Sequence, residues 1–254
     1  MNSNIIYSCF DYTGRETPGY LHLHLYLLKQ YASKYNIDLK IINTRCDYFS
    51  KLYIKHLAYD DFSRSSYNKM LWVDTDVFIS PEAPDIFKDV TGDFSAKQIT
   101  DQDTTTNKLD NKYMKSFLSV FKNDHMYDMM HNSYFNTGVM VITKCVIDKI
   151  IDQWYDTYTR LKSIYTKGNM LSVESFNIHE NRGIFREEFI TNYVVLLNNI
   201  CVSPINTMYH QSVGHIDDIN IIKPNPGWFV HYDGYDNNTK NAAITESLID
   251  GTLF

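Results

Sequence analysis

Two aspartates separated by one residue, Asp74 and Asp76, lie between the apolar runs Met70–Val73 and Val77–Ile79. Alternate side chains of an extended segment share a face, so we expect both carboxylates on one face and Thr75 on the other. Unpaired carboxylates at the end of an apolar strand are costly to desolvate, and a divalent cation would remove that cost. Such a cation, held by one or two carboxylates, commonly takes phosphate oxygens as its other ligands. Without further context, the pair is more often a solvated turn.

A histidine far along the chain is placed in the same way. His231 follows the apolar residues Trp228–Val230, and Gly234 behind it would let the backbone approach a ligand closely. A single histidine at a strand end is more often structural. Two carboxylates and one imidazole together, however, leave coordination positions open for phosphate oxygens. An imidazole ligand favours Mn²⁺, while Mg²⁺ remains a second candidate. The expected metal ligands are therefore Asp74, Asp76 and His231.

The segments that must position these residues alternate between strand and helix patterns. Apolar runs predict strands at 4–10, 39–42, 69–79, 134–142 and 228–235, with a further strand starting near 93–96. Helical spacing predicts helices after Pro18 and at 50–62, 113–121, 144–168 and 187–198. Strand, helix and strand in succession predict a right-handed parallel crossover. We therefore expect an α/β fold with a mixed, mostly parallel sheet flanked by helices.

The exit of the first strand is a candidate nucleotide site. Open α/β sheets bind ligands outside the carboxyl ends of their strands. The residues at that end, Ser8, Phe10, Asp11 and Tyr12, are expected to hold a base and a ribose. An ordinary turn would use the same residue types, and the sequence leaves both interpretations equally open. The polar residues 98–106 predict a mobile loop, and the stretch 97–132 that contains it is expected to contribute to a lid on the acceptor side.

Composition restricts the class of protein. The 254 residues are 44% hydrophobic and 21% charged, which is typical of a globular protein with a substantial core. A net charge of −6 without a basic block argues against a nucleic-acid partner. Four scattered cysteines indicate a reducing compartment. No signal peptide or membrane-spanning segment is recognised, so we expect a cytoplasmic location, in the host if the chain is viral.

Four segments of this chain occur in the order seen in GT-A glycosyltransferases. The sequence resembles glycosyltransferase family 8, which includes glycogenin, over roughly residues 4–235, in the segments Ser50-Lys51-Leu52, Asp74-Thr75-Asp76, 135–140 and 230–234. The resemblance implies a single GT-A domain over 1–254, with a nucleotide-binding half at 1–95 and an acceptor half at 96–254 that ends in a metal-ligand segment. It also implies that Mn²⁺ holds the diphosphate of a UDP-sugar, whose sugar is transferred with retention to a glycan or another hydroxyl acceptor.

The resemblance also assigns roles to single residues. Lys51 would contact the phosphate or the donor sugar, and Asn136 and Gly138 would line the donor and acceptor side. Thr75, Thr137 and Gly234 belong to the same donor-binding motifs. Glu187 and Glu188 stand where the family often has Asp-Gln, and either could orient the reaction or stabilise a cationic sugar. The carboxylate is kept and the glutamine is not, so contacts to the donor sugar would differ from those of the family.

Two other enzyme classes also use paired aspartates. A phosphatase of the haloacid-dehalogenase type would use Asp74 as a nucleophile on phosphorus, but there the motif normally follows the first strand. A nucleotidyltransferase would bind metal through Asp74 and Asp76, but it usually carries a Gly-rich basic first turn, of which Thr13-Gly14-Arg15 is a poor version. A non-catalytic sugar- or nucleotide-binding protein would not need both aspartates and His231. These alternatives stay open at the level of the sequence.

Overall fold

The computed structural model describes residues 3–10, 19–43, 48–99, 107–168, 187–212, 227–232 and 244. Its strands are β1 (Asn4–Phe10), β2 (Asp38–Asn43), β3 (Lys69–Val73), β4 (Val77–Ile79), β5 (Phe94–Gln98), β6 (Phe135–Thr143), β7 (Val202–Pro204), β8 (Gln211–Ser212) and β9 (Phe229–His231). Its α-helices are α1 (Gly19–Tyr35), α2 (Tyr48–Arg64), α3 (Ile86–Asp89), α4 (Asn107–Phe121), α5 (Tyr127–Asn132), α6 (Lys144–Gly168) and α7 (Glu187–Leu197). Two 3₁₀ turns are η1 (Asp124–Met126) and η3 (Thr207–Tyr209).

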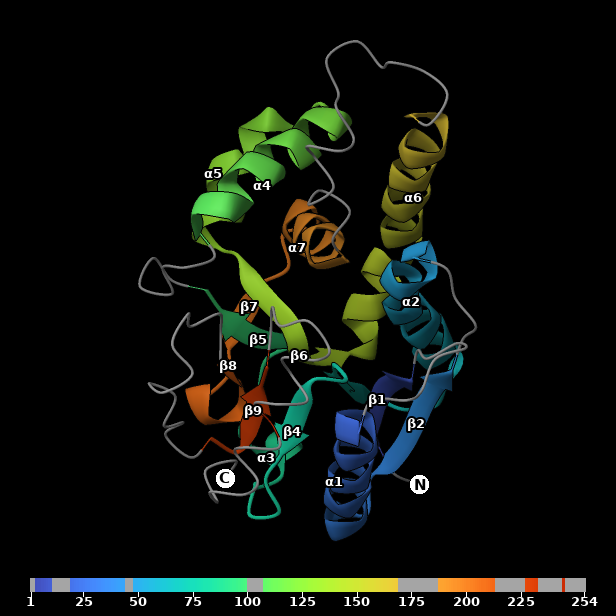
Figure 1. Cartoon of the computed structure of the whole chain (residues 1–254), viewed down its shortest axis with the longest axis vertical. Coiled ribbons are helices and arrows are strands. Elements are labelled where there is room, and N and C mark those ends of the chain that lie inside the picture. Colours follow the sequence, from blue (N-terminus) through green and yellow to red (C-terminus); the bar gives the residue numbers. More distant parts are fainter. Residues whose placement is uncertain are drawn as a thin grey trace.

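Six strands form the main sheet in the order β2-β1-β3-β6-β5-β7 (Figure 1). The pairs β1·β2, β1·β3 and β5·β7 are parallel, whereas β6 runs antiparallel to both β3 and β5. The predicted α/β class with a mixed, mostly parallel sheet is confirmed. Because β6 alone runs in reverse, its first residues lie at the same edge as the last residues of β3.

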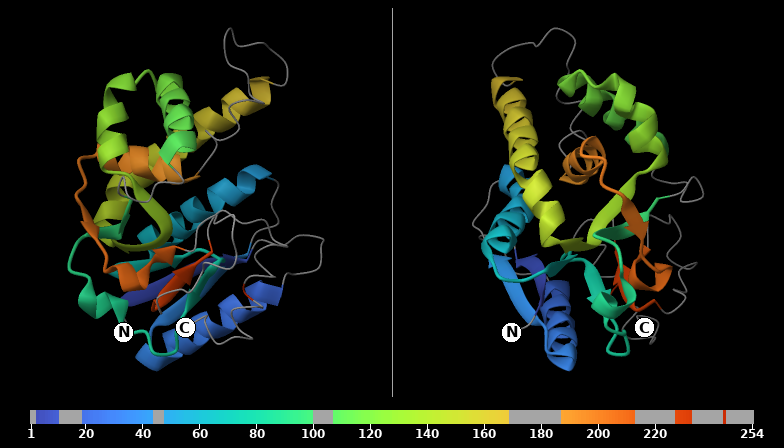
Figure 2. Two further views of the ribbon diagram at one scale, coloured as in Figure 1. Left: turned by 60° about the vertical axis from the view of Figure 1, so that its left-hand side comes forward. Right: turned by 180° about the vertical axis from the view of Figure 1, so that it is seen from behind.

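The central strands are apolar on both faces, which is typical of a sheet covered on both sides. In β3, Met70 and Trp72 belong to one core cluster, and Leu71 and Val73 belong to the other. The first cluster packs the sheet against α2, α4, α6 and α7, and the second packs it against α1 and α3. Figure 2 shows these helices on the two sides of the sheet. This period-two burial fixes which face of the sheet each residue of β3 points to.

A smaller sheet joins the segment after β3 to the C-terminal part of the chain. Its order is β4-β9-β8, with Val77 opposite His231 in the antiparallel β4·β9 pair. The predicted strand at 69–79 is therefore two strands in different sheets, separated by a turn at residues 74–76. The predicted strand at 228–235 is shorter, since β9 ends at His231. Period-two patterns cannot reveal a turn when apolar residues continue on both sides of it.

Of the polar loop predicted at 98–106, Gln98 ends β5 and residues 100–106 lie outside the described part, whereas the helix predicted at 113–121 is confirmed as part of α4. The helix α4 begins at Asn107, earlier than the predicted start at 113, and η1 and α5 follow it. Its buried residues Met114, Phe117 and Leu118 pack in the cluster that contains α7. The role of the stretch 97–132 as a lid stays a prediction. Among the described helices, none has a long enough apolar stretch to cross a membrane.

Candidate functional site

The two aspartates lie in a turn that is held by three backbone hydrogen bonds. The amide of Asp74 donates to the carbonyl of Gly138 at 2.8 Å, and Val77 donates to the carbonyl of Asp74 at 3.2 Å. The amide of Tyr232 donates to the carbonyl of Asp76 at 3.0 Å. The two carboxylates do lie close together, as expected, but the expected reason is wrong, because residues 74–76 are not extended. A turn, bound to β6 and to the end of β9, brings the carboxylates together instead.

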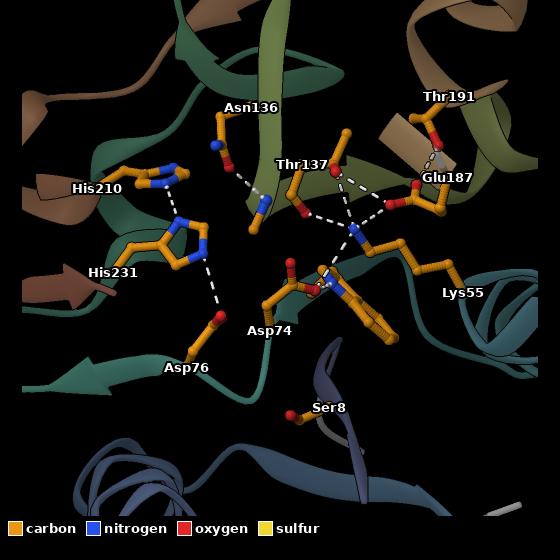
Figure 3. Close-up of polar contacts among 12 residues, drawn as sticks. Ser8, Lys55, Asp74, Asp76, Asn136, Thr137, Glu187, Thr191, His210 and His231 are labelled. Carbon is orange, nitrogen blue, oxygen red and sulfur yellow. Dashed lines mark hydrogen bonds and ion pairs between the residues drawn. The ribbon is translucent and has the colours of Figure 1, made fainter. Parts of the chain in front are cut away.

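Asp74, Asp76 and His231 form a cluster in which one potential ligand atom of each residue lies within 4.8 Å of the others. His231 is 4% exposed, and its Nε2 lies 3.2 Å from Oδ1 of Asp76 (Figure 3). Two carboxylate oxygens and one imidazole nitrogen are ligand types that suit Mn²⁺, and carboxylates alone would suit Mg²⁺. The residues present therefore fit a divalent cation with positions left for a ligand's oxygens.

Gly138 sets the distance between β6 and the ring of His231. A Cβ atom at this position would lie 2.8 Å from Nδ1 of His231 and closer still to its Cε1. Oδ1 of Asn136 accepts a hydrogen bond of 2.7 Å from the amide of Gly138, which holds the first residues of β6 in place. Asn136 thus supports the backbone beside the cluster, and Gly138 leaves the space that the imidazole occupies.

Asp74 contacts a second group of polar residues through the same oxygen, Oδ1. The indole Nε1 of Trp72 donates to it at 2.6 Å, and Nζ of Lys55 lies 3.4 Å from it. Trp72 belongs to the core cluster that packs against α2 and α7, and these two contacts hold Asp74 on the same side of the sheet. The other oxygen of Asp74 points away from these donors (Figure 3). Asp74 can therefore contact Trp72 and Lys55 through one oxygen and offer the other oxygen to a cation held with Asp76 and His231.

Lys55 is a buried lysine whose side chain is surrounded by acceptors. Its Nζ lies 2.5 Å from Oε2 of Glu187 and donates to the carbonyl and the hydroxyl of Thr137, both at 2.9 Å. Burial alone would lower the pKa of Lys55, but the carboxylates of Asp74 and Glu187 outweigh it and raise the pKa. Lys55 is therefore charged at all physiological pH values, as its carboxylate neighbours require.

Glu187 begins α7 and is held on both of its oxygens. Oε1 accepts from the hydroxyl of Thr191 at 2.5 Å, and Oε2 accepts from Lys55 and from Thr137 at 3.1 Å. Burial raises the pKa of Glu187, and Lys55 opposes that change. Glu188 is half-buried, and its backbone carbonyl accepts a hydrogen bond from Asn192. Of the two predicted glutamates, Glu187 is the one that the structure joins to the aspartate turn.

Lys55 was not among the residues singled out from the sequence. The predicted lysine was Lys51, which lies in the first turn of α2 and whose side chain is outside the described part. The two lysines are four residues apart, so they lie on the same side of the helix. In the folded chain Lys55 lies between Ile54 and Ala58, both of which are buried, but the sequence contains no signal that prefers it to Lys51.

Ser8 at the end of β1 is buried and bonded to α1. The carbonyl of Val77 can only accept, so Nδ1 of His24 donates to it at 2.7 Å. Burial lowers the pKa of His24, against the opposing carboxylates of Asp76 and Asp74, and the ring is neutral. Its Nε2 therefore accepts the 2.9 Å hydrogen bond from Ser8. Phe10 ends β1, and its side chain is outside the described part of the structure. The predicted site residues Asp11, Tyr12 and Gly234 also lie outside the described residues.

Comparison with known proteins relates this chain to glycosyltransferases by fold. No protein-family model matches the sequence, and no curated protein matches it. A solved glycosyltransferase involved in the glycosylation of the major capsid of PBCV-1 has a TM-score of 0.54 and 14% identity, covering 96% of this chain and 98% of that one. The galactosyltransferase LgtC, solved with donor and acceptor sugar analogs, has a TM-score of 0.49 and 12% identity, covering 98% and 96%. The chain shares the fold of the PBCV-1 enzyme, and membership of family 8 stays a prediction.

Proposed function

We propose that this protein is a metal-dependent glycosyltransferase. It transfers a sugar from a nucleotide diphosphate, a UDP-sugar, to a hydroxyl group of a glycan or another acceptor, with retention of the anomeric configuration. The observation that carries the proposal is the meeting of two side-chain groups at Asp74. One group is the Asp74, Asp76 and His231 cluster, and the other is Lys55 with Glu187. The fold shared with a glycosyltransferase supports it.

The first group suits the leaving diphosphate. Asp74, Asp76 and His231 would hold Mn²⁺, or Mg²⁺ in its place, and Thr75 lies in the turn between the aspartates. A divalent cation at this position supplies Lewis-acid stabilisation of the charge that builds up on the phosphate oxygens. His231 is buried and lies against Gly138, so its ring is oriented before any ligand arrives. Preorganised ligands of this kind lose little entropy on binding.

The second group suits the sugar. In the transfer, a bond forms between the acceptor oxygen and the anomeric carbon, and the bond from that carbon to the diphosphate breaks with its electron pair. The acceptor's proton leaves with the diphosphate. Positive charge develops on the sugar, and the carboxylate of Glu187, oriented by Lys55 and Thr137, would stabilise it. In this proposal Asn136, Thr137 and Gly138 face the sugar, residues 1–95 bind the nucleotide and 96–254 the acceptor. Ser8, which is buried and bonded to His24, would support the nucleoside side from beneath.

The phosphatase alternative is not favoured. Asp74 follows β3, the third strand of the chain, and the sheet contains the antiparallel strand β6. One of the two oxygens of Asp74 is also engaged by Trp72 and lies close to Lys55. No observation in the described part of the chain favours a nucleotidyltransferase either.

One experiment tests the proposal directly. The full chain is incubated with Mn²⁺ and a panel of UDP-, GDP- and CMP-sugars, and release of the nucleotide is measured with and without added glycan acceptors. We expect metal-dependent release from a UDP-sugar, and loss of UDP binding in Asp76→Asn with an unchanged unfolding temperature. Cleavage of a generic phosphate ester without action on any nucleotide sugar would establish the phosphatase instead. Unchanged UDP affinity in Asp76→Asn would refute the metal assignment.

A further inference from the structure

A second histidine lies directly behind the proposed ligand His231. Nε2 of His210 is 2.8 Å from Nδ1 of His231, and the two ring centroids are 5.0 Å apart. His210 is fully buried, at 0% exposed. A neutral imidazole has one donor nitrogen and one acceptor nitrogen.

The backbone holds His210 firmly at this position. His210 follows the turn η3, and its amide donates to the carbonyl of Thr207 at 3.1 Å. Asn206 caps the same turn by accepting from Met208 at 3.0 Å. The next residues, β8, pair in parallel with β9, where Ser212 lies opposite His231. Two elements on either side of His210 therefore fix its ring relative to His231.

The hydrogen bond between Nε2 of His210 and Nδ1 of His231 can run in either direction, depending on which ring donates. Without a cation and with both rings neutral, Nε2 of His231 donates to Asp76 at 3.2 Å, since a carboxylate only accepts. His210 then donates from Nε2 to Nδ1 of His231, and the Nδ1 atom of His210 carries a lone pair and no proton. That Nδ1 has no hydrogen-bond partner within the part of the chain that the structure describes.

A cation at Nε2 of His231 reverses this direction. The proton of His231 must then lie on Nδ1, and His210 becomes its acceptor. His210 must in turn carry its own proton on Nδ1, a buried donor without a partner among the described residues. Cation binding at Nε2 of His231 would therefore move the proton of each ring from Nε2 to Nδ1.

We propose that His210 is the positioning residue of the metal site. It holds His231 with Nε2 toward the cation by accepting the hydrogen bond from Nδ1, and both rings exchange tautomers when the cation binds. The proposal rests on the proposed function, since it requires a cation at Asp74, Asp76 and His231. It differs from the more common arrangement, in which a carboxylate or a backbone carbonyl accepts from a metal-bound histidine.

Two variants separate hydrogen bonding from packing at His210. His210→Gln places an amide near the position of Nε2 and can accept from His231, whereas His210→Phe keeps a ring and removes the acceptor. Mn²⁺ binding in the presence of UDP is measured by electron paramagnetic resonance of free Mn²⁺, with unfolding temperatures as the control for folding. We expect His210→Phe to weaken binding 10–100-fold and His210→Gln to stay within about threefold of the unchanged protein. A purely structural role predicts the reverse order, which would overturn the proposal.

The tautomers are measured directly by nitrogen-15 NMR of the histidine rings, with Zn²⁺ as a diamagnetic probe. We expect both His210 and His231 to change from the Nε2–H to the Nδ1–H form when Zn²⁺ and UDP are added. A change at His231 without a change at His210 would overturn the proposal and leave the metal site intact. If His231 does not respond and Mn²⁺ does not bind the unchanged protein, the proposed metal-dependent function itself fails.

Discussion

Replacing Lys55 with methionine should lower the free energy of unfolding by about 3–5 kcal/mol, the usual cost of removing one partner of a buried ion pair. The side chain of Lys55 is 5% exposed and that of Glu187 is 11% exposed, so solvent cannot replace the lost partner. Methionine fills a similar volume, so most of the loss is due to the unpaired carboxylate and the orphaned carbonyl of Thr137. Asp74 also loses a nearby cation, since its Oδ1 lies 3.4 Å from Nζ of Lys55, but its side chain is 30% exposed and keeps the hydrogen bond from Trp72, so solvent offsets part of that loss.

The assay is urea denaturation at pH 7.5, followed by circular dichroism, of Lys55→Met, Glu187→Gln and the double variant. Removing the charge of Glu187 as well removes the main penalty, so the double variant should be more stable than the sum of the single losses by about 2 kcal/mol. Lys40→Met is the matched control. Lys40 pairs with Asp61 at 2.6 Å, but its side chain is 49% exposed, so this variant should lose less than about 1 kcal/mol.

Two results would refute this reasoning. The first is a loss in Lys55→Met no larger than that of the exposed control Lys40→Met. The second is a double variant whose loss equals the sum of the single losses within about 0.5 kcal/mol, which is the behaviour of independent sites. Either result would mean that Lys55 and Glu187 do not depend on each other in the folded protein.

Two further predictions concern the surroundings of the cluster. Gly138→Ala places a methyl group against the ring of His231, so Mn²⁺-dependent UDP binding, measured by calorimetry, should weaken by roughly tenfold or more; unchanged binding would show that the ring is free to move. His24 has a lowered pKa in the folded state, so the unfolded chain binds the extra proton, and stability is complete above about pH 6.5 and lost as the pH falls. His24→Asn should therefore lose less stability between pH 6.5 and 5 than the unchanged protein, by up to about 1.4 kcal/mol per pH unit in urea denaturation; parallel pH profiles would contradict the assignment.

The sequence predicts the sheet well because its strands are apolar on both faces. Residues 4–10 and 134–142 correspond closely to β1 and β6, and the helix expected to end at Gly168 does so. The direction of β6 and its place next to β3 could not be read from the sequence, because an apolar strand looks the same in both directions. The closeness of Gly138 and His231 depends on that placement.

Only those residues of the candidate site could be predicted whose type and local sequence already indicate metal binding. The aspartate pair and His231 could be selected because each follows an apolar run. Lys55 could not be preferred over Lys51, since both lie on the same side of α2, and only packing shows which one meets Glu187. His210 gave no signal, because a histidine behind another ligand has no fixed spacing from it in the sequence.

The contacts around Asp74 have a consequence for the order in which ligands can bind. Asp74, Asp76 and Glu187 bring three negative charges to this edge of the sheet, and Lys55 brings one positive charge. With the histidines neutral, these four described side chains sum to two negative charges. In the proposed function, these side chains would repel a nucleotide that arrives without a cation, whereas a nucleotide bound to a divalent cation would bring the opposing charge with it. Nucleotide and cation should consequently associate with this protein as a pair, with nucleotide affinity rising together with the concentration of the cation.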